Sequence, residues 1–253
     1  MAGGSDSLAG ALERDLASVF ATHTTLPAIV EAGLEGRLGS LACDRDAARL
    51  SLGCYEMFGG DAQSPGARRL IAGARRRELV YGNDPPWRAA ILAVRGDEVI
   101  DRPMTEFDAG SLDPSALARA EASVDPGFTV RRLDEALASQ LDGELEPHGL
   151  QVYASARDLV EHGLGYGAVT GDGILAAAAT SYTLSSRYLE VAIATRPAFR
   201  GRGLAMVVGA ALLREALARN LVPCWSASNP VSKRLAVRLG YRPAGECEVL
   251  LLK

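Results

Sequence analysis

The sequence has few of the residues that bind metals. Its 253 residues include three histidines and four cysteines, and no two cysteines have the CxxC spacing. Because zinc sites are usually built from closely spaced cysteines and histidines, we expect no metal site. Cysteines without a disulfide pattern favour a reducing compartment, and we expect the protein to be cytoplasmic.

No segment is typical of a secretion signal or a membrane span. The first residues, MAGGSDSLAG, lack a basic region followed by an apolar one, and no run reaches the ~18 apolar residues of a spanning helix. The net charge of −4 does not provide the concentrated basic face on which nucleic-acid binding depends. We therefore expect neither a membrane nor a nucleic acid as a partner.

Apolar residues are abundant, at 48% of the chain, which is enough for one large domain or two ordinary ones. Helical periodicity predicts helices over residues 7–23 and 44–58, and no internal repeat is visible. A turn at residues 125–127, Asp-Pro-Gly, marks a change of pattern. We predict an accessory domain over residues 1–122 and a second domain over residues 127–253.

The second domain alternates strands and helices. Its patterns predict strand 128–134, helix 135–145, a short helix 155–163, hairpin strands 166–170 and 174–182, strand 188–195, helix 203–220, strand 222–228, helix 230–240 and strand 247–252.

The stretch RPAFRGRGLA, residues 196–205, joins an apolar strand to an apolar helix. The first amides of a helix have no carbonyl partners, and together with the helix dipole they attract anions. Small residues at 201, 203 and 205 leave the backbone accessible, and three arginines add positive charge. These features predict that the turn is a cradle for a pyrophosphate group, bound by its backbone amides. The simpler alternative is that the glycines only end the strand and that nothing binds there.

Two common nucleotide-binding motifs do not fit this turn. A GxGxxG fingerprint would need a glycine where Met206 stands, and the GxxxxGK motif of phosphate-binding loops occurs nowhere. Residues 163–168, GLGYGA, match GxGxxA, but a helical segment precedes them and a hairpin follows, so the match is a coincidence of spacing.

Two segments resemble the GNAT acyltransferase superfamily. RGRGLA matches its RxxGxG/A motif through Arg200, Gly203 and Ala205, and NPVSKRLAVRLGY, residues 229–241, is similar to its NxxSxxLxxxxGF/Y segment. More narrowly, the chain resembles the two-domain group that includes zwittermicin A resistance acetyltransferases. The resemblance implies an α/β (α+β) fold with a mixed, mainly antiparallel central sheet flanked by helices, preceded by a smaller, helix-rich α/β N-terminal domain.

The resemblance also implies acetyl-CoA, or another acyl-CoA, as the donor substrate, with no metal. Its pantetheine arm would pair with the strand at Ile193, Ala194 and Thr195. The residues implied for the pyrophosphate are Arg200, Gly201, Arg202, Gly203, Leu204 and Ala205. Asn229 would touch the pantetheine, and Lys233 would approach the nucleotide phosphates.

Amine acetylation needs a proton acceptor, because an alkylamine with a pKa near ~10.4 is almost wholly protonated at neutral pH. Glu190 is the candidate catalytic base, since it is the only charged residue of the strand 188–195 and burial would raise its pKa. The alternative is a structural pairing of Glu190 with Arg187 or Arg196.

The departing thiolate needs a proton or stabilisation. Many members of the superfamily use a tyrosine one position after the leucine of NxxSxxL, but here that residue is Ala236. Ser232, four residues earlier on the same helical face, is the catalytic candidate that acts through water. Tyr182 and Tyr241 are substitutes, and the thiolate leaves readily enough that no acid is strictly required. Trp225 is interpreted as core packing.

These observations predict an acyl-CoA-dependent N-acetyltransferase that acetylates a primary amine of a small molecule. Two alternatives stay open: a non-catalytic CoA-binding regulatory module and an acetyltransferase for protein amines. The sequence does not decide the acceptor, the acyl group or the oligomeric state, and a homodimer is compatible with it.

Overall fold

The computed structural model describes residues 18–20, 23, 25–75, 78–141, 145 and 152–253. The chain forms two compact units, Met1–Met104 with Glu246–Lys253 and Thr105–Gly245. Strands β5 (Val99–Asp108) and β11 (Arg242–Leu252) each contain residues of both units. The domain boundary predicted at residues 122–127 stays a prediction.

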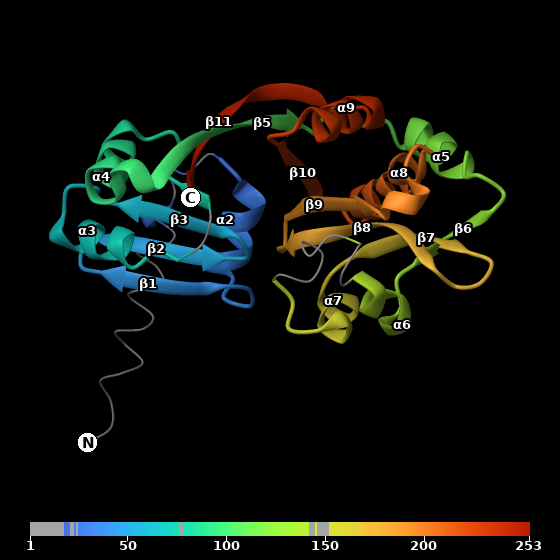
Figure 1. Cartoon of the computed structure of the whole chain (residues 1–253), viewed down its shortest axis with the longest axis horizontal. Coiled ribbons are helices and arrows are strands. Elements are labelled where there is room, and N and C mark those ends of the chain that lie inside the picture. Colours follow the sequence, from blue (N-terminus) through green and yellow to red (C-terminus); the bar gives the residue numbers. More distant parts are fainter. Residues whose placement is uncertain (1–17, 21–22, 24, 76–77, 142–144, 146–151) are drawn as a thin grey trace, which may run out of the picture. The chain divides into compact units, whose positions relative to one another are not determined.

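The first unit contains a mixed sheet with the order β1-β2-β3-β4-β11 (Figure 1). Strands β1 to β3 form an antiparallel meander, β3 and β4 are parallel, and β4 and β11 are antiparallel. Its further elements are α2 (Pro27–Leu34), β1 (Ser40–Asp44), β2 (Ala47–Leu52), β3 (Tyr55–Gly60), α3 (Pro65–Ala72), β4 (Glu78–Val80), α4 (Pro85–Arg95) and the 3₁₀ turn η1 (Gly96–Glu98).

The second unit contains a sheet with the order β5-β10-β9-β8-β7-β6, in which only β9 and β10 are parallel. Its further elements are α5 (Pro114–Ala122), β6 (Phe128–Arg132), α6 (Glu135–Ala138), η2 (Ser139–Leu141), α7 (Ala156–His162), β7 (Gly165–Thr170), β8 (Leu175–Leu184), β9 (Tyr188–Thr195), η4 (Pro197–Phe199), α8 (Leu204–Ala218), β10 (Val222–Ala227) and α9 (Pro230–Leu239).

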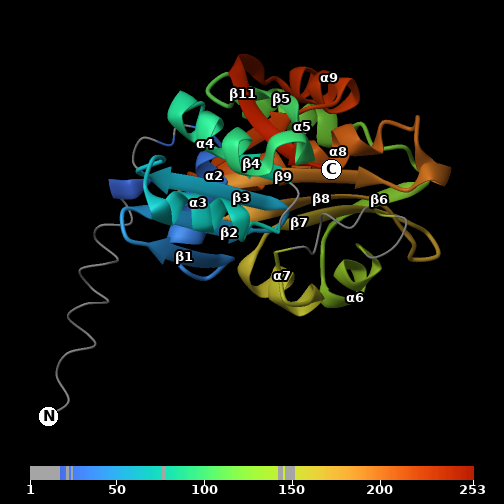
Figure 2. The same cartoon turned by 60° about the vertical axis from the view of Figure 1, so that its left-hand side comes forward.

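The two faces of this sheet are covered by different helices. Figures 1 and 2 show α6 and α7 on one face of strands β7 and β8, with α8 on the other. Small side chains on β8, at Ala176, Ala177 and Ala179, pack with Val208 and Leu212 of α8. Alanines let the helix approach the sheet closely, which fixes the start of α8 beside the end of β9.

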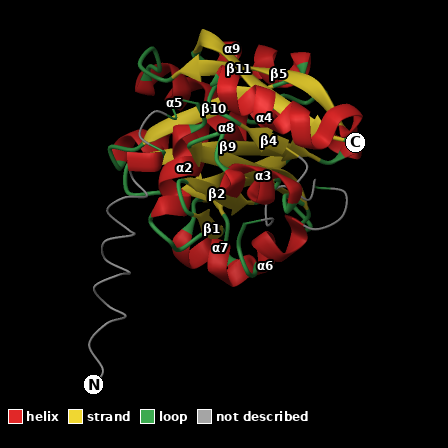
Figure 3. Cartoon of the chain, turned by 90° about the vertical axis from the view of Figure 1, so that its left-hand side faces the viewer, coloured by secondary structure: helices red, strands yellow, loops and turns green. Residues whose placement is uncertain are grey.

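The same order of elements occurs in both units, although the sequence shows no repeat. Each has an antiparallel meander, a helix, a strand parallel to the meander's last strand, a second helix and a final strand. In the first unit these helices are α3 and α4, which pack against each other (Figure 3). In the second unit they are α8 and α9.

The predicted fold class is confirmed, but one predicted helix is wrong. Residues 44–58 form the hairpin of β2 and β3, whose strands pair from Leu52 opposite Tyr55 to Ala47 opposite Gly60. Gly53 has a φ of 56°, which a tight turn requires and a helix does not allow. Buried residues on both strands explain the misleading periodicity. The helix predicted over 7–23 lies almost entirely outside the described residues.

Candidate active site

The parallel strands β9 and β10 separate after three residue pairs. Val222, Pro223 and Cys224 lie opposite Tyr188, Leu189 and Glu190. Beyond Cys224, strand β10 pairs with β5 instead. A cavity of about 840 Å³ begins where the strands part, and it is lined by residues of β9, β10, the turn before α8, the first turn of α8 and one side of α9 from Val231 to Arg238. Within the described ladders, the β10 side of β9 is therefore left open next to this cavity.

The start of α8 faces the same cavity. Gly201 and Gly203 have φ values of 80° and 76°, and nothing lies within 4 Å of a Cβ built on either. The helix has no side-chain cap, unlike α9, where Asn229 accepts a hydrogen bond from the Ser232 amide at 2.8 Å. The described backbone bonds leave the amides from Gly201 to Ala205 without partners, and such amides form an anion-binding turn.

Most of the residues predicted to bind the donor line this cavity. They are Ile193, Ala194, Thr195, Arg200, Gly201, Gly203, Leu204, Ala205 and Asn229. Two predicted residues do not: Lys233, and Arg202, whose guanidinium stacks on Phe128 with 5.7 Å to the ring centroid. The Arg200 amide bonds to the Pro197 carbonyl at 3.3 Å, so the free amides begin at Gly201.

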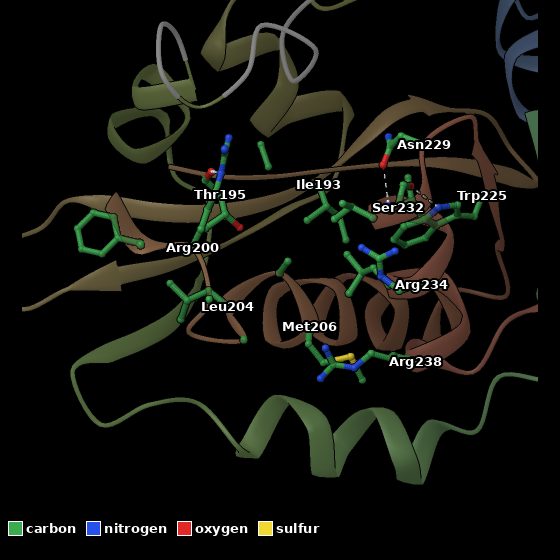
Figure 4. A pocket seen from close by; sticks show the side chains of 18 of the residues that line it. Ile193, Thr195, Arg200, Leu204, Met206, Trp225, Asn229, Ser232, Arg234 and Arg238 are labelled. Atoms are coloured by element: carbon green, nitrogen blue, oxygen red, sulfur yellow. Dashed lines mark hydrogen bonds between the residues drawn. The ribbon is translucent and has the colours of Figure 1, made fainter. Parts of the chain in front are cut away.

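Sequence reasoning missed two basic residues of this cavity. Arg234 and Arg238 of α9 line it, and Figure 4 shows Arg238 beside Met206 of α8. Their spacing of four residues places both side chains on one face of α9. The four-residue spacing of the two arginines is visible in the sequence. It indicates a binding role only once the structure shows that this face of α9 borders the cavity.

Ser232 and Trp225 are hydrogen-bonded to each other at the end of the cavity away from Arg200 (Figure 4). The Trp225 indole N–H donates to the Ser232 hydroxyl oxygen at 3.0 Å, and both residues line the cavity. Trp225 is also 4% exposed and packs with Tyr241 in the core. Because the hydroxyl accepts the indole hydrogen bond, its own proton remains available to a group in the cavity.

Glu190 lies at the last paired position before the strands separate. Its side chain is 5% exposed, and burial, with the negative charge of Glu106 as the second cause, raises its pKa to about 8. The hydroxyl and backbone amide of Ser226 lie close enough to oppose part of this rise in the pKa, while Oε2 of Glu190 has no partner. Ser226 itself lines the cavity, so one residue connects the buried carboxyl to the open space.

The predicted alternative partners of Glu190 have other contacts. Arg196 donates to the carbonyls of Leu175 and Gln140 at 2.7 and 3.2 Å, and Arg187 donates to the Tyr188 hydroxyl at 3.1 Å. In the described part of the chain, no arginine contributes to the pKa of Glu190.

The residues considered as acids differ in accessibility. Ala236 is fully buried and packs with Trp225 and Leu239 in the core. The Tyr241 hydroxyl donates to the Pro223 carbonyl at 3.0 Å, and burial raises its pKa well above the usual value. Tyr182 is buried at the register shift of β8, between Ser181 and Thr183. Ser232 is the one candidate acid that lines the cavity.

The described residues contain neither a metal-binding cluster nor a membrane-spanning helix. Among the described residues there is no group of three or more histidine, cysteine or acidic side chains placed to hold a metal ion. The helices in this part of the chain include none long and apolar enough to cross a membrane.

Solved structures resemble this chain over nearly its whole length. A GCN5-related N-acetyltransferase-like protein from Streptococcus suis 89/1591 has a TM-score of 0.83 at 24% identity, covering 96% of this chain and 99% of that one. A GCN5-related N-acetyltransferase from Kribbella flavida has a TM-score of 0.61 at 16% identity, with coverages of 90% and 96%. These likenesses support the fold.

A third solved structure also aligns with nearly the whole chain. A tandem GNAT protein from the clavulanic acid biosynthesis pathway has a TM-score of 0.59 at 16% identity and covers 99% of this chain and 96% of that one. No curated protein matches the sequence. The sequence matches the family described as GNAT acetyltransferase over residues 18–250, and the chain therefore belongs to the GNAT acetyltransferase family.

Proposed function

We propose that this chain transfers an acetyl group from acetyl-CoA to a primary amine of a small molecule. The observation that carries the proposal is one continuous cavity. It joins the uncapped start of α8, the open side of β9 and, through Ser226, the buried carboxyl group of Glu190. Family membership supports acyl transfer in general, while the acetyl group and the amine are part of the proposal.

The α8 end of the cavity is suited to the diphosphate of the donor. Free amides from Gly201 to Ala205 supply hydrogen-bond donors, and the helix dipole favours negative charge there. Arg234 and Arg238 add two positive charges on the α9 side. Guanidinium groups bind phosphate through two parallel hydrogen bonds, so these arginines take the role that the sequence assigned to Lys233.

The open side of β9 is suited to the extended arm of the donor. Backbone groups of Ile193, Ala194 and Thr195 lie along the cavity, and strands accept extended partners through main-chain hydrogen bonds. An amide of this segment also provides the donor that stabilises the oxyanion of the tetrahedral intermediate.

Glu190 takes the proton of the attacking amine. The amine nitrogen forms a bond to the thioester carbonyl carbon, the carbon–sulfur bond breaks, and its electron pair goes to sulfur. A pKa of about 8 makes Glu190 a stronger base than an exposed carboxylate. Ser226 relays or orients the proton, since it contacts the carboxyl group and lines the cavity. The Ser232 hydroxyl donates a proton to the thiolate through water, a role supported by its position in the cavity wall.

Incubation with labelled acetyl-CoA and a panel of small amines tests the proposal. We expect the labelled acetylated amine and free CoA to form in equal amounts. Chromatography detects the labelled amine, and thiol titration measures the free CoA. Calorimetry with CoA is the matching binding measurement. If CoA does not bind and no amine is labelled, the proposal is wrong.

One observation favours a second candidate, a CoA-binding regulatory module. Ala236 occupies the position where many relatives have a tyrosine, and it is fully buried. This candidate predicts CoA binding without turnover on any small amine or protein amine. Any acetylated product in the same assay excludes it.

A further inference from the structure

Two glutamates share one face of the sheet in the second unit. Glu106 on β5 lies directly opposite Ser226 on β10, and Glu190 on β9 lies opposite Cys224, two residues earlier on the same strand. Because side chains of paired residues point to the same face and residues two apart share a face, Glu106, Cys224, Ser226 and Glu190 all face one side. Their neighbours Phe107 and Trp225 pack in the apolar core on the other side.

Ser226 stands between the two carboxyl groups. It lies close enough to Glu190 to lower the pKa of that carboxyl group, and as the direct cross-strand partner of Glu106 it has its Cβ about 5 Å from that of Glu106. Glu106 and Ser226 are partly exposed, whereas Glu190 is buried. The acidic face therefore reaches from the cavity wall at Ser226 to accessible surface at Glu106.

The carboxyl group of Glu190 lies in an unfavourable environment for its charged form. Burying a carboxyl group is costly unless hydrogen bonds or opposite charge compensate, and here the second carboxyl group adds repulsion. Glu190 is more than nine-tenths buried, and its Oε2 has no hydrogen-bond partner. Oε2 of Glu190 can therefore accept a hydrogen bond from a bound ligand, such as the N–H group of an amine.

We propose that Glu106 and Glu190 together select an acceptor with two amino groups. Glu190 receives the amino group that is acetylated, and Glu106 holds the second one as an ammonium ion. The inference rests on the proposed function and narrows its substrate class to diamines. Since β10 lies between the strands that carry the two glutamates, these strands are roughly 9–10 Å apart, and the offset of two residues along β10 makes the backbone separation of Glu106 and Glu190 roughly 12 Å. A flexible chain between the two amino groups can span the part of this distance that the two side chains leave.

The test compares α,ω-diamines of two to six carbons with monoamines of the same length. Rates are measured at pH 9, where Glu190 is mostly ionised and the second amino group still carries its charge. For the wild type we expect kcat/KM roughly tenfold to a hundredfold higher for the better diamines than for the matching monoamines, the gain from one charge-assisted hydrogen bond. Equal values for both series overturn the inference without any variant.

Glu106→Gln keeps the shape of the side chain and removes its charge. We expect it to reduce the diamine-to-monoamine ratio of kcat/KM at least tenfold, mainly through KM. Glu106→Asp keeps the charge and should retain part of the preference. Glu161→Gln is the control, because Glu161 is exposed and forms an ion pair with Arg157 on α7. A ratio that stays at the wild-type value in Glu106→Gln overturns the inference.

The pH profile of Glu106→Gln tests the proximity of the two glutamates, on which the inference depends. The charge of Glu106 raises the pKa of Glu190, so its removal should shift the acidic limb of the profile to lower pH for all amines, and an unmoved limb would overturn the inference.

Failure of the inference and failure of the proposed function are distinguishable. If no amine is acetylated, calorimetry of 1,4-diaminobutane and butylamine with the CoA-loaded protein still decides whether the second amino group is recognised. Tighter binding of the diamine, lost in Glu106→Gln, supports the inference. Equal binding of both amines, or none, overturns it.

Discussion

Replacing Glu190 by glutamine removes the ionisable group and keeps the shape of the side chain. If Glu190 takes the proton of the amine, kcat/KM falls about a hundredfold or more while the affinity for CoA stays level. In the wild type, activity should rise through pH 8, since the carboxyl group must be ionised to accept the proton. Steady-state kinetics measure the change in kcat/KM and its pH dependence, and calorimetry measures the affinity for CoA. An unchanged rate in Glu190→Gln would mean that Glu190 has a structural role only.

The same residue makes a prediction about stability. The pKa of Glu190 is about 8 in the folded protein against an ordinary 4.5, so between these pH values the folded protein holds a proton that the unfolded chain has released. Stability therefore falls as pH rises across this window, by about 1.4 kcal/mol per unit of pKa difference at most. In Glu190→Gln this loss of stability does not occur, because glutamine does not ionise.

We expect the melting temperature of Glu190→Gln, relative to the wild type, to increase from pH 5 to pH 8 and then to level off. Melting curves at several pH values measure this difference directly. A difference that does not change with pH would contradict the assigned burial of the carboxyl group.

At the scale of single elements, the start of α8 can be tested through a pair of glycines. Gly203 and Gly173 have φ values of 76° and 85°, and both have open space where a Cβ would lie. Alanine at either position costs about 1–2 kcal/mol through backbone strain. Only Gly203→Ala should also weaken CoA binding, by roughly tenfold, because only this glycine borders the cavity. Gly173, in the β7–β8 turn, is the matched control, and equal CoA affinities in the two variants would exclude the cradle.

The basic face of α9 makes a separate prediction. Changing Arg234 and Arg238 together to glutamine should lower the affinity for CoA about tenfold or more, and the loss should shrink as salt is added. Dephospho-CoA, which lacks the 3′-phosphate, serves as the comparison ligand: a smaller loss for it places the arginines at that phosphate. Arg157→Gln, on the exposed face of α7, is the control. A double variant with wild-type affinity would contradict a role in donor binding.

The elements that hold the cradle were predictable because their signals are local. The strand that ends at Thr195 is a single apolar run closed by Pro197, and Pro230 and Gly240 bound α9 in the sequence as in the structure. The hairpin over residues 44–58 was missed because buried residues on both faces of its strands mask the alternation.

The catalytic surroundings of Glu190 depend on pairing between distant strands. Ser226 and Glu106 lie beside Glu190 only because β10 separates from β9 and pairs with β5, and no local pattern encodes that separation. For the same reason the cavity face of α9, with Arg234, could not be assigned from sequence, whereas the uncapped glycine turn at 201–203 could.

For the whole molecule, the repeated order of elements raises the question of a second donor site. In the first unit the turn between β3 and α3 corresponds to the cradle between β9 and α8, but it is closed. Ser64 caps α3 by accepting a hydrogen bond from the Ala67 amide at 3.1 Å, and the Asp61 amide bonds to the Asp46 carbonyl at 2.7 Å. A Cβ on Gly66 would lie 2.1 Å from the carbonyl oxygen of Asp44, so backbone already fills the space that a phosphate would need.

We therefore expect one donor molecule per chain. Calorimetric titration with CoA should give a stoichiometry of one, and Gly203→Ala should weaken that single site rather than reveal a second. Ser64→Ala is the complementary variant: it removes the cap of α3 and should cost about 1 kcal/mol of stability without changing the stoichiometry, because the β1–β2 turn still occupies the space in front of the helix. Two equivalents of CoA bound per chain would contradict this expectation. They would mean that the β1–β2 turn moves aside and that the first unit binds a donor molecule as well.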